Sequence, residues 1–172
     1  MCARISGIAL LLLLFACSSP TGHDAKDEIR SRNTDLERAF VANKPLALAA
    51  IYHENACMIP QEWRVACGKA EIEDYWTRIS EPVDWKLDVI LVSKNENELY
   101  QSAYYQELEL KPRHWSEVDI ELPDSVETMY ELGHSALSYR LEDGTLHEGH
   151  VDFILVWIKI DGEWEIFVDT YV

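Results

Sequence analysis

The chain has 172 residues, which is enough for one domain of ordinary size with a substantial core. Its formal net charge of -16 at pH 7 gives a surface that repels nucleic-acid phosphates and anionic lipid headgroups. Because the sequence has no basic patch to offset this charge, it argues against a nucleic-acid-binding role. The simplest interpretation of the charge is solubility.

Residues 1–16 have the pattern of a cleaved targeting segment. Arg4 gives a positive start, and residues 8–15 form an apolar stretch too short to span a bilayer. The segment closes with Leu14-Phe15-Ala16-Cys17, which resembles the lipobox of bacterial lipoprotein signal peptides. This resemblance implies cleavage before Cys17 and acylation of its thiol and amine. The alternative is an ordinary secretory signal peptide that contains a Cys.

Acyl chains on Cys17 would hold the protein at the cell envelope, since each buried CH₂ contributes about 0.8 kcal/mol. In lipoproteins, Ser18 rather than Asp after the Cys implies the periplasmic side of the outer membrane if the cell has two membranes. Residues 17–25, with Pro20 and Gly22, then form a short lipidated tether. The folded domain is expected from residue 26 to residue 172.

Three helices are predicted in the first part of this domain. The first lies within residues 26–43, Pro45 starts a second short helix that ends at residues 53–55, and the third follows Gly68. The first and third helices each have one face to bury. These faces consist of Ile29, Asn33, Leu36 and Phe40 in the first helix and of Ile72, Tyr75, Trp76 and Ile79 in the third.

A short apolar hairpin, residues 57–60 and 65–67, is predicted between the second and third helices, with its centre near Glu62. Cys57 and Cys67 are equidistant from that centre, so they should face each other across the strands. Outside the cytoplasm such a pair can be oxidised, and a disulfide closing this short loop would stabilise the fold by roughly 3 kcal/mol. Two buried free thiols are the alternative.

The middle of the chain is less regular. Residues 85–93 alternate apolar and polar as a strand should, whereas residues 99–110 fit a helix in one part and a strand in another. Val118, Ile120 and Leu122 alternate with acidic residues, which predicts an edge strand with its acidic side in water.

The C-terminal quarter predicts a meander of three long strands. Its apolar runs are separated by Asp143-Gly144 and Asp161-Gly162, and a Gly after an Asp supplies the positive φ of a two-residue hairpin turn. Counting from the last turn pairs Trp157 with Ile166, Ile154 with Asp169 and Asp152 with Tyr171. Counting from the first turn pairs Leu137 with His150, Ser135 with Asp152 and Tyr139 with Glu148. A turn longer by one residue would reverse these assignments.

These pairings give the last hairpin two different faces. One face is continuously apolar and includes Phe153, Leu155 and Ile166. The other is apolar near the turn and ionisable at its far end, where it carries His150, Asp152, Asp169 and Tyr171. This second face is predicted to be the wall of a pocket.

The order of these elements, together with the stretches AIYHENACMIP, CGKAEIEDYW and FILVWIKIDGEWEIFVDTYV, resembles the SnoaL-like (DUF4440-type) branch of the NTF2-like superfamily. The resemblance covers about residues 26–85 and 126–172, although Asn55 stands where the family often has Asp. It implies an α+β fold in which a curved antiparallel sheet wraps around three N-terminal helices as a cone with one cavity. It also implies a possible homodimer through the outer side of the sheet.

Residues 94–124 stand out as an insertion in this comparison. Loops of that length are uncommon in compact domains unless they are functional or carry structure of their own. The insertion is therefore interpreted either as a lid over the mouth of the cone or as an extension of the sheet.

The predicted wall could support proton transfer. The diagonal spacing across an antiparallel pair is about 7 to 8 Å, so Asp152 and Asp169 could reach one ligand. Burial and a neighbouring carboxylate raise the pKa of a carboxyl group, which would separate a general acid from a general base. His150 could complete a proton relay, and Tyr171 could donate to an oxyanion. The resemblance implies such chemistry without a cofactor, or a cavity with no reaction.

Two other interpretations have less support. His147, His150 and Asp152 suggest a metal site, but residues three apart on a strand face opposite sides, so only His150 and Asp152 could share an ion. We therefore expect no metal. Six tryptophans could line an aromatic cage, although core packing is the more common role. They are Trp63, Trp76, Trp85, Trp115, Trp157 and Trp164.

Three functions follow as hypotheses. The first is binding of a small, largely apolar molecule in a cavity closed by Tyr52, Trp76 and the predicted wall. The second is a cofactor-free isomerase or lyase that uses Asp169 and His150 as acid and base. The third is a non-catalytic module for dimerisation or for binding a protein partner.

Overall fold

The structure is a computed structural model that describes residues 24–61 and 64–172. The predicted signal peptide, Cys17 and most of the tether lie outside the described residues, as does Trp63. The elements in chain order are α1 (Ala25–Val41), α2 (Pro45–Ala49), β1 (Tyr52–Pro60), β2 (Ala66–Cys67), α3 (Lys69–Thr77), β3 (Glu81–Ser93), α4 (Glu96–Gln101), α5 (Ala103–Glu107), the 3₁₀ helix η1 (Trp115–Val118), β4 (Glu127–Arg140), β5 (Leu146–Ile160) and β6 (Glu163–Tyr171). None of the helices in this part of the chain could cross a membrane.

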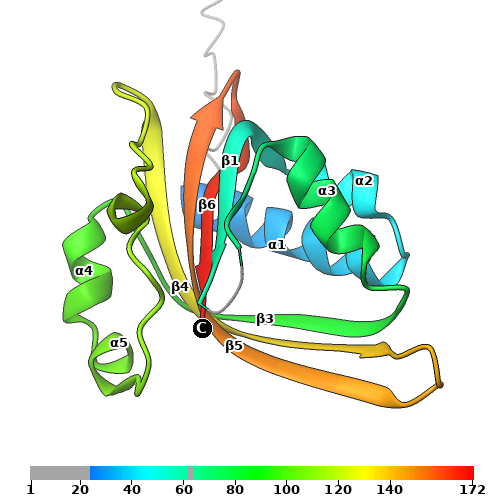
Figure 1. Ribbon diagram of the computed structural model, residues 1–172. Coiled ribbons are helices and arrows are strands. Elements are labelled where there is room, and N and C mark those ends of the chain that lie inside the picture. The colour runs from blue at the N-terminus through cyan, green and yellow to red at the C-terminus, as the bar shows by residue number, and fades with distance from the viewer. Residues whose placement is uncertain (1–23, 62–63) are drawn as a thin grey trace, which may run out of the picture.

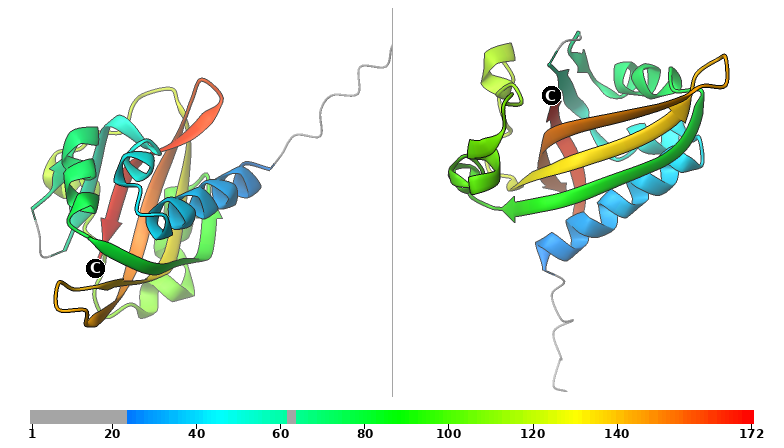
Figure 2. Two further views of the ribbon diagram at one scale, coloured as in Figure 1. Left: turned by 90° about the vertical axis from the view of Figure 1, so that its right-hand side faces the viewer. Right: turned by 90° about the horizontal axis from the view of Figure 1, so that it is seen from below.

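The six strands form one curved sheet in the order β2-β1-β6-β5-β4-β3. Helices α1, α2 and α3 lie on one side of the sheet, and α4 and α5 lie on the other (Figure 1). Figure 2 shows the long strands β3, β4 and β5 bending together beside α1. The pairs are antiparallel, except that β1 runs parallel to β6. The predicted fold class, a curved sheet around three N-terminal helices, is confirmed.

The first three helices follow the predicted pattern closely. Ile29, Leu36 and Phe40 of α1 are buried, and α2 begins at Pro45. Gly68, at φ +79°, supplies the positive-φ residue from which α3 starts. The prediction that the second helix ends at residues 53–55 is wrong, because α2 stops at Ala49 and these residues already belong to β1.

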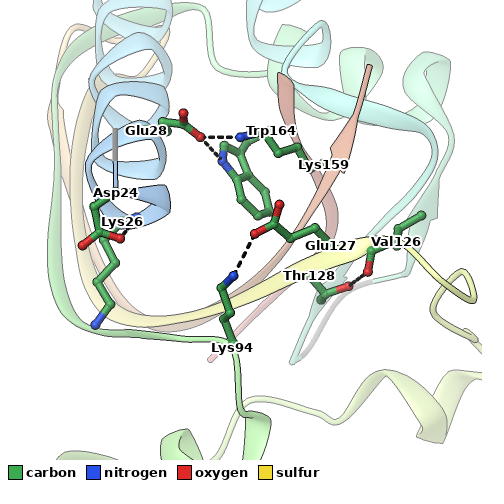
Figure 3. Close-up of polar contacts among 9 residues, drawn as sticks. All are labelled: Asp24, Lys26, Glu28, Lys94, Val126, Glu127, Thr128, Lys159 and Trp164. Atoms are coloured by element: carbon green, nitrogen blue, oxygen red, sulfur yellow. Dashed lines mark hydrogen bonds and ion pairs between the residues drawn. The ribbon is translucent and has the colours of Figure 1, made fainter. Parts of the chain in front are cut away.

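The start of α1 is fixed to the β5–β6 hairpin by one carboxylate. Glu28 accepts hydrogen bonds from Trp164 Nε1 and Lys159 Nζ, both at 2.7 Å (Figure 3). Lys159 and Trp164 are paired across the two strands. A negative charge in the first turn is also favoured by the helix dipole. The helix is therefore held against the sheet at the end where the tether would enter.

The predicted short hairpin and its disulfide are both present. Cys57 pairs directly with Cys67 in the register of β1 and β2, and their sulfur atoms are bonded. The bond closes a loop with a sequence separation of 10 residues. It ties the two-residue edge strand β2 to the sheet, next to the pair formed by Met58 and Ala66.

The insertion covers the outer face of the sheet. It contains α4, α5 and η1, and the predicted edge strand at residues 118–122 is wrong, because η1 ends at Val118 and Asp119 turns the chain at φ +58°. Its apolar side chains pack on those of the strands. This outer cluster is formed by Leu99, Trp115, Val118, Ile120 and Leu122 from the insertion and by Ile59, Leu132, Ile154, Val156, Ile158 and Phe167 from the sheet.

This arrangement differs from both interpretations of the insertion. It is neither a lid on the helix side nor an extension of the sheet, but a second layer. The alternating residues Val118, Ile120 and Leu122 have an apolar surface to bury, and they bury it against the sheet instead of pairing with an edge. Much of the face predicted to form a homodimer is therefore occupied by the chain itself.

The register of the last hairpin agrees with the prediction near its turn and differs beyond it. Asp161 and Gly162 have φ of +51° and +92°, as a tight primed turn requires, and Trp157 pairs with Ile166. A β-bulge then leaves Phe167 as an extra residue, so that Leu155 pairs with Asp169. The predicted pairs Ile154–Asp169 and Asp152–Tyr171 are therefore wrong.

The first hairpin has a longer turn than predicted. Leu141 N–H donates to Thr145 O at 2.9 Å, and Gly144, at φ +82°, donates to Leu141 O at 2.8 Å. Such a three-residue loop ends in a residue of left-handed conformation, which Gly supplies. The predicted partners of Leu137, Ser135 and Tyr139 are each wrong by one residue. The observed pairs are Leu137 with Gly149, Ser135 with Val151 and Tyr139 with His147.

Candidate functional site

A cavity of about 480 Å³ lies between helices α1 and α3 and the concave side of the sheet. Most of the side chains around it are aliphatic or aromatic. It is lined by Leu36, Tyr52, Tyr75, Trp76, Arg78, Ile79, Trp85, Leu87, Ser135, Leu137, Tyr139, His147, Gly149, Val151, Phe153, Leu155, Ile166, Asp169 and Tyr171.

The strands place these side chains by alternation. On β5, Val151, Phe153 and Leu155 point into the cavity, as the period of two requires. On β6, however, Ile166 and Asp169 both line the cavity although they are three residues apart. The bulge at Phe167 explains this, because one extra residue reverses the alternation. Asp169 and Tyr171 therefore face the interior on account of the bulge.

A buried tyrosine–carboxylate pair is the main polar feature of the cavity. The Tyr52 hydroxyl donates to Asp169 Oδ2 at 2.7 Å. Burial raises the pKa of Asp169 to about 6, and the hydrogen bond from Tyr52 opposes only part of this rise. Burial and the nearby carboxylate raise the pKa of the Tyr52 hydroxyl well above its ordinary value, so that it remains a donor near neutral pH.

Two further polar pairs lie on the cavity wall. The Tyr171 hydroxyl donates to the Tyr75 hydroxyl at 2.6 Å, and burial raises the pKa of both groups. Trp85 Nε1 donates to Ser135 Oγ at 2.8 Å. The hydrogen-bond donors of Tyr171 and Trp85 are thus engaged within the protein.

The Trp76 indole differs from these groups. Its side chain lines the cavity beside Trp85, with the ring centroids 5.1 Å apart, and the residue is only 6% exposed. Its Nε1–H is buried and has no hydrogen-bond partner. The indole N–H lies near the Tyr52 hydroxyl and lowers the pKa of that group, but the two groups do not meet in the geometry of a hydrogen bond.

A second buried carboxylate lies next to the cavity. Glu131 of β4 is fully buried, and its two oxygens accept from Asn33 Nδ2 at 2.7 Å and from Trp157 Nε1 at 2.6 Å. Burial raises the pKa of Glu131 to about 7, and the charge of Asp169 contributes to the rise. Two carboxyl groups whose pKa values are raised by burial, to about 6 for Asp169 and about 7 for Glu131, therefore lie inside the cone.

Glu131 was not among the predicted site residues, although the sequence carried a signal for it. Glu131 lies two residues from Met129 and four from Ser135, so strand alternation places all three on one face. A glutamate on the inward face of a strand has to be buried, and a buried carboxylate needs donors. Asn33 on the buried face of the first helix was such a donor.

Four of the six predicted site residues meet at the cavity. Tyr52, Trp76, Asp169 and Tyr171 all line it, whereas His150 and Asp152 lie on the opposite face of the sheet. The prediction that Asp152 and Asp169 face one ligand is therefore wrong. Its cause is the register error, since His150 and Asp152 alternate with cavity residues Gly149 and Val151 on β5.

On the outer face, Asp152 has other partners. It accepts a hydrogen bond from the Tyr104 hydroxyl at 2.5 Å, and His134 Nδ1 lies 3.1 Å from the same oxygen. The rings of His134 and His150 stack with centroids 5.7 Å apart. Asp152 thus links the insertion to the sheet, and a proton relay from Asp169 to His150 would have to cross the sheet.

Some of the tryptophans line the cavity, as an aromatic cage would require, and others pack in the core. Trp76 and Trp85 line the cavity, while Trp115, Trp157 and Trp164 are packed in the two cores.

Across residues 24–61 and 64–172, no three His, Cys, Asp or Glu side chains are placed to hold a metal ion.

Comparison with solved structures supports the fold assignment. An NTF-2 like protein of unknown function from Shewanella oneidensis superposes with a TM-score of 0.55 at 15% identity, covering 85% of this chain and 97% of that one. A ketosteroid isomerase-like protein from Erwinia carotovora atroseptica gives 0.57 at 12%, covering 83% and 91%. A protein from Catenulispora acidiphila in complex with S-DNPA gives 0.56 at 11%, covering 85% and 90%.

The fold is therefore that of the NTF2-like proteins. No protein-family model and no curated protein matches the chain by sequence.

The buried position of Glu131 predicts a pH dependence of stability. Its pKa is about 7 in the folded protein and near 4.5 when exposed, so the folded state holds the proton more tightly between these values. The contribution of Glu131 to the free energy of unfolding is therefore at its maximum below about pH 4.5. It falls by about 3 kcal/mol in total as the pH rises through 7. In Glu131→Gln, the free energy of unfolding, measured in urea at pH 5 and pH 8, should fall less with pH than in the wild type.

Glutamine can be accommodated at this position. Asn33 Oδ1 is buried without a partner, and rotation of the Asn33 amide would let it accept from the new side-chain amide. Glu148→Gln, an exposed change on β5, serves as the control. Equal pH dependence in Glu131→Gln and the wild type would contradict the prediction.

Proposed function

We propose that this protein is a lipid-anchored, extracytoplasmic domain that binds a small, largely apolar molecule in its cavity. The cavity carries this proposal. Its volume of about 480 Å³ lies in the range of small-molecule sites, and its walls are mainly apolar with a few convergent polar groups. The perturbed pKa of Asp169 in the same cavity adds to its likeness to a functional site.

The proposed location rests on different residues. The lipobox-like sequence at Leu14 to Cys17 supports acylation of Cys17. The Cys57–Cys67 disulfide fits an oxidising compartment, since disulfides are rare in the cytosol. Placement on the periplasmic side of the outer membrane, in a Gram-negative cell, follows from Ser18.

Cell fractionation tests the anchor. In a Gram-negative bacterial host, the full chain should enter the membrane fraction, with an intact mass that corresponds to cleavage before Cys17 plus acyl chains. Cys17→Ala should lose both the acylation and the membrane association, because no thiol remains to be modified. A wild-type protein that is soluble in the periplasm and unacylated would show that the segment is an ordinary secretory signal.

Filling the cavity should weaken ligand binding. Val151 points into the cavity, whereas His150, the next residue on β5, points outward. Val151→Trp should weaken binding of the neutral fluorescent probe N-phenyl-1-naphthylamine roughly tenfold or more, since the cavity cannot hold both groups. His150→Trp adds the same side chain to the outer face and should change the dissociation constant less than about twofold.

Fluorescence titration of the signal-free domain measures these constants, and circular dichroism verifies that both variants fold. Equal weakening by the two substitutions would place the probe outside the cavity. A wild type that does not bind the probe would argue against an apolar binding site.

A second candidate function is cofactor-free acid–base catalysis. The observation that favours it is the Tyr52–Asp169 pair, in which a buried carboxylate with a pKa of about 6 is held by a hydroxyl donor. Such a carboxylate can act as a general base near neutral pH. His150 is not available as the acid, because it lies on the other face of the sheet. The cavity groups nearest to this role are Tyr52 and Tyr171.

Deuterium exchange tests this candidate without a known substrate. In D₂O, the wild type should accelerate exchange of the methyl protons of 2-acetylnaphthalene, and the rate should rise as pH passes about 6 because Asp169 acts as the carboxylate. Asp169→Asn should slow the exchange roughly 100-fold. Asp152→Asn, on the outer face of the same hairpin, should leave it unchanged. A wild-type rate equal to that of buffer would rule out carbon-acid catalysis on this probe and leave the binding proposal intact.

The third hypothesis, assembly through the sheet, has less support. The insertion already buries much of the outer face, including Leu132, Ile154 and Val156. A partner that bound this face would first have to displace α4, α5 and η1.

A further inference from the structure

Two indole groups on the cavity wall differ in whether their N–H makes a hydrogen bond. Trp76 and Trp85 are each 6% exposed, and their rings are adjacent. Trp85 Nε1–H donates to Ser135 Oγ at 2.8 Å, whereas Trp76 Nε1–H has no partner. The Trp85 donor is thus engaged within the protein, whereas the Trp76 donor makes no hydrogen bond, although the Tyr52 hydroxyl lies near it.

An unpaired buried donor is costly to the free protein. Leaving such a group without an acceptor destabilises a fold by about 1 to 3 kcal/mol, which a bound acceptor would offset. Within the described part of the chain, three buried side-chain polar atoms have no partner. Two of them, Asn33 Oδ1 and Tyr100 Oη, belong to residues that do not line the cavity. Trp76 Nε1 is the one whose side chain faces it.

The surrounding polar groups determine which ligand could meet this donor. The hydroxyl hydrogens of Tyr52 and Tyr171 are donated within the protein, to Asp169 and to Tyr75. An indole N–H donates and cannot accept. A carbonyl or hydroxyl oxygen of the ligand could accept this hydrogen bond, whereas an ammonium group has no lone pair and could not accept it. The complementary group is therefore an oxygen acceptor.

We propose that Trp76 is the specificity-determining residue of the cavity and that its ligand is an apolar molecule carrying a carbonyl or similar acceptor oxygen, bound by the Trp76 N–H. This inference rests on the proposed function, because it assigns a ligand class to the same cavity. The acceptor would sit beside the Tyr52–Asp169 pair, since Trp76 lies next to the Tyr52 hydroxyl. The aromatic rings of Trp76 and Trp85 would contact the apolar part of the molecule.

Two probes of matched shape test this assignment. The compound 2-acetylnaphthalene carries a ketone oxygen, and 2-ethylnaphthalene has a methylene in its place. Both are titrated into the ¹⁵N-labelled domain, and the indole N–H signals are followed by NMR. The Trp76 signal is identified by its loss in Trp76→Phe. We expect it to move downfield with the ketone and not with the hydrocarbon, because only the ketone accepts a hydrogen bond.

Affinity provides the second measurement. In Trp76→Phe, the ratio of ketone affinity to hydrocarbon affinity should fall roughly three- to tenfold, the loss expected for one hydrogen bond. Trp85→Phe is the matched control, since it removes an indole from the same wall whose N–H is already engaged. It should leave this ratio unchanged even if both affinities decline through lost contact area.

The outcomes separate this inference from the proposed function. If both probes bind but the ratio is the same in Trp76→Phe and the wild type, the cavity binds apolar molecules and the role of Trp76 is wrong. A Trp76 proton that is already downfield without a probe, and does not move with the ketone, would show an internal hydrogen bond and would also overturn the assignment. If neither probe binds the wild type, both proposals fail.

Discussion

The bulge at Phe167 determines which side chains of β6 enter the cavity. Nearer the turn, β6 follows the regular register set by Asp161 and Gly162, and Ile166 faces inward. The extra residue then reverses the alternation, so that Asp169 and Tyr171 face inward where Val168 and Thr170 would otherwise lie. The same bulge bends a strand at the centre of a strongly curved sheet, which connects the shape of the cone to the polarity of its interior.

The sequence predicted the elements well and the register poorly, for physical reasons. Helical spacing in residues 26–43, Pro45 and Gly68 are local signals, and the Cys57–Cys67 pair follows from symmetry about a short turn. A bulge has no comparable signature, since Phe167 suits either face of a strand. Gly144 marks the three-residue turn as readily as a two-residue one. The register of each hairpin thus differs from the predicted one by one residue. As a result, Asp169 and Tyr171 face the cavity, whereas His150 and Asp152 face the other side of the sheet.

The insertion explains a further property of the sheet. Without it, Leu132, Ile154, Val156 and Phe167 would form an apolar outer face that needs a partner. The insertion supplies Leu99 and Trp115 to that face, and its attachment is strengthened where the Tyr104 hydroxyl bonds Asp152. Asp152 is thus better understood as an anchor for the insertion than as a ligand-binding group. The sheet is buried on both sides, which is why its central strands read as continuous apolar runs and not as alternating ones.

Two buried carboxyl groups and one unpaired indole give the cavity its chemical character. Glu131 is held by two donors and is not among the lining residues, and its link to the cavity is the charge of Asp169, which raises the pKa of Glu131. Asp169 faces the cavity directly, with Tyr52 engaging one of its oxygens. A ligand oxygen at Trp76 would therefore lie close to a carboxylate that can hold or release a proton near neutral pH. Binding and proton transfer would use the same few groups, and what separates them is whether the ligand places an acidic C–H within reach of Asp169.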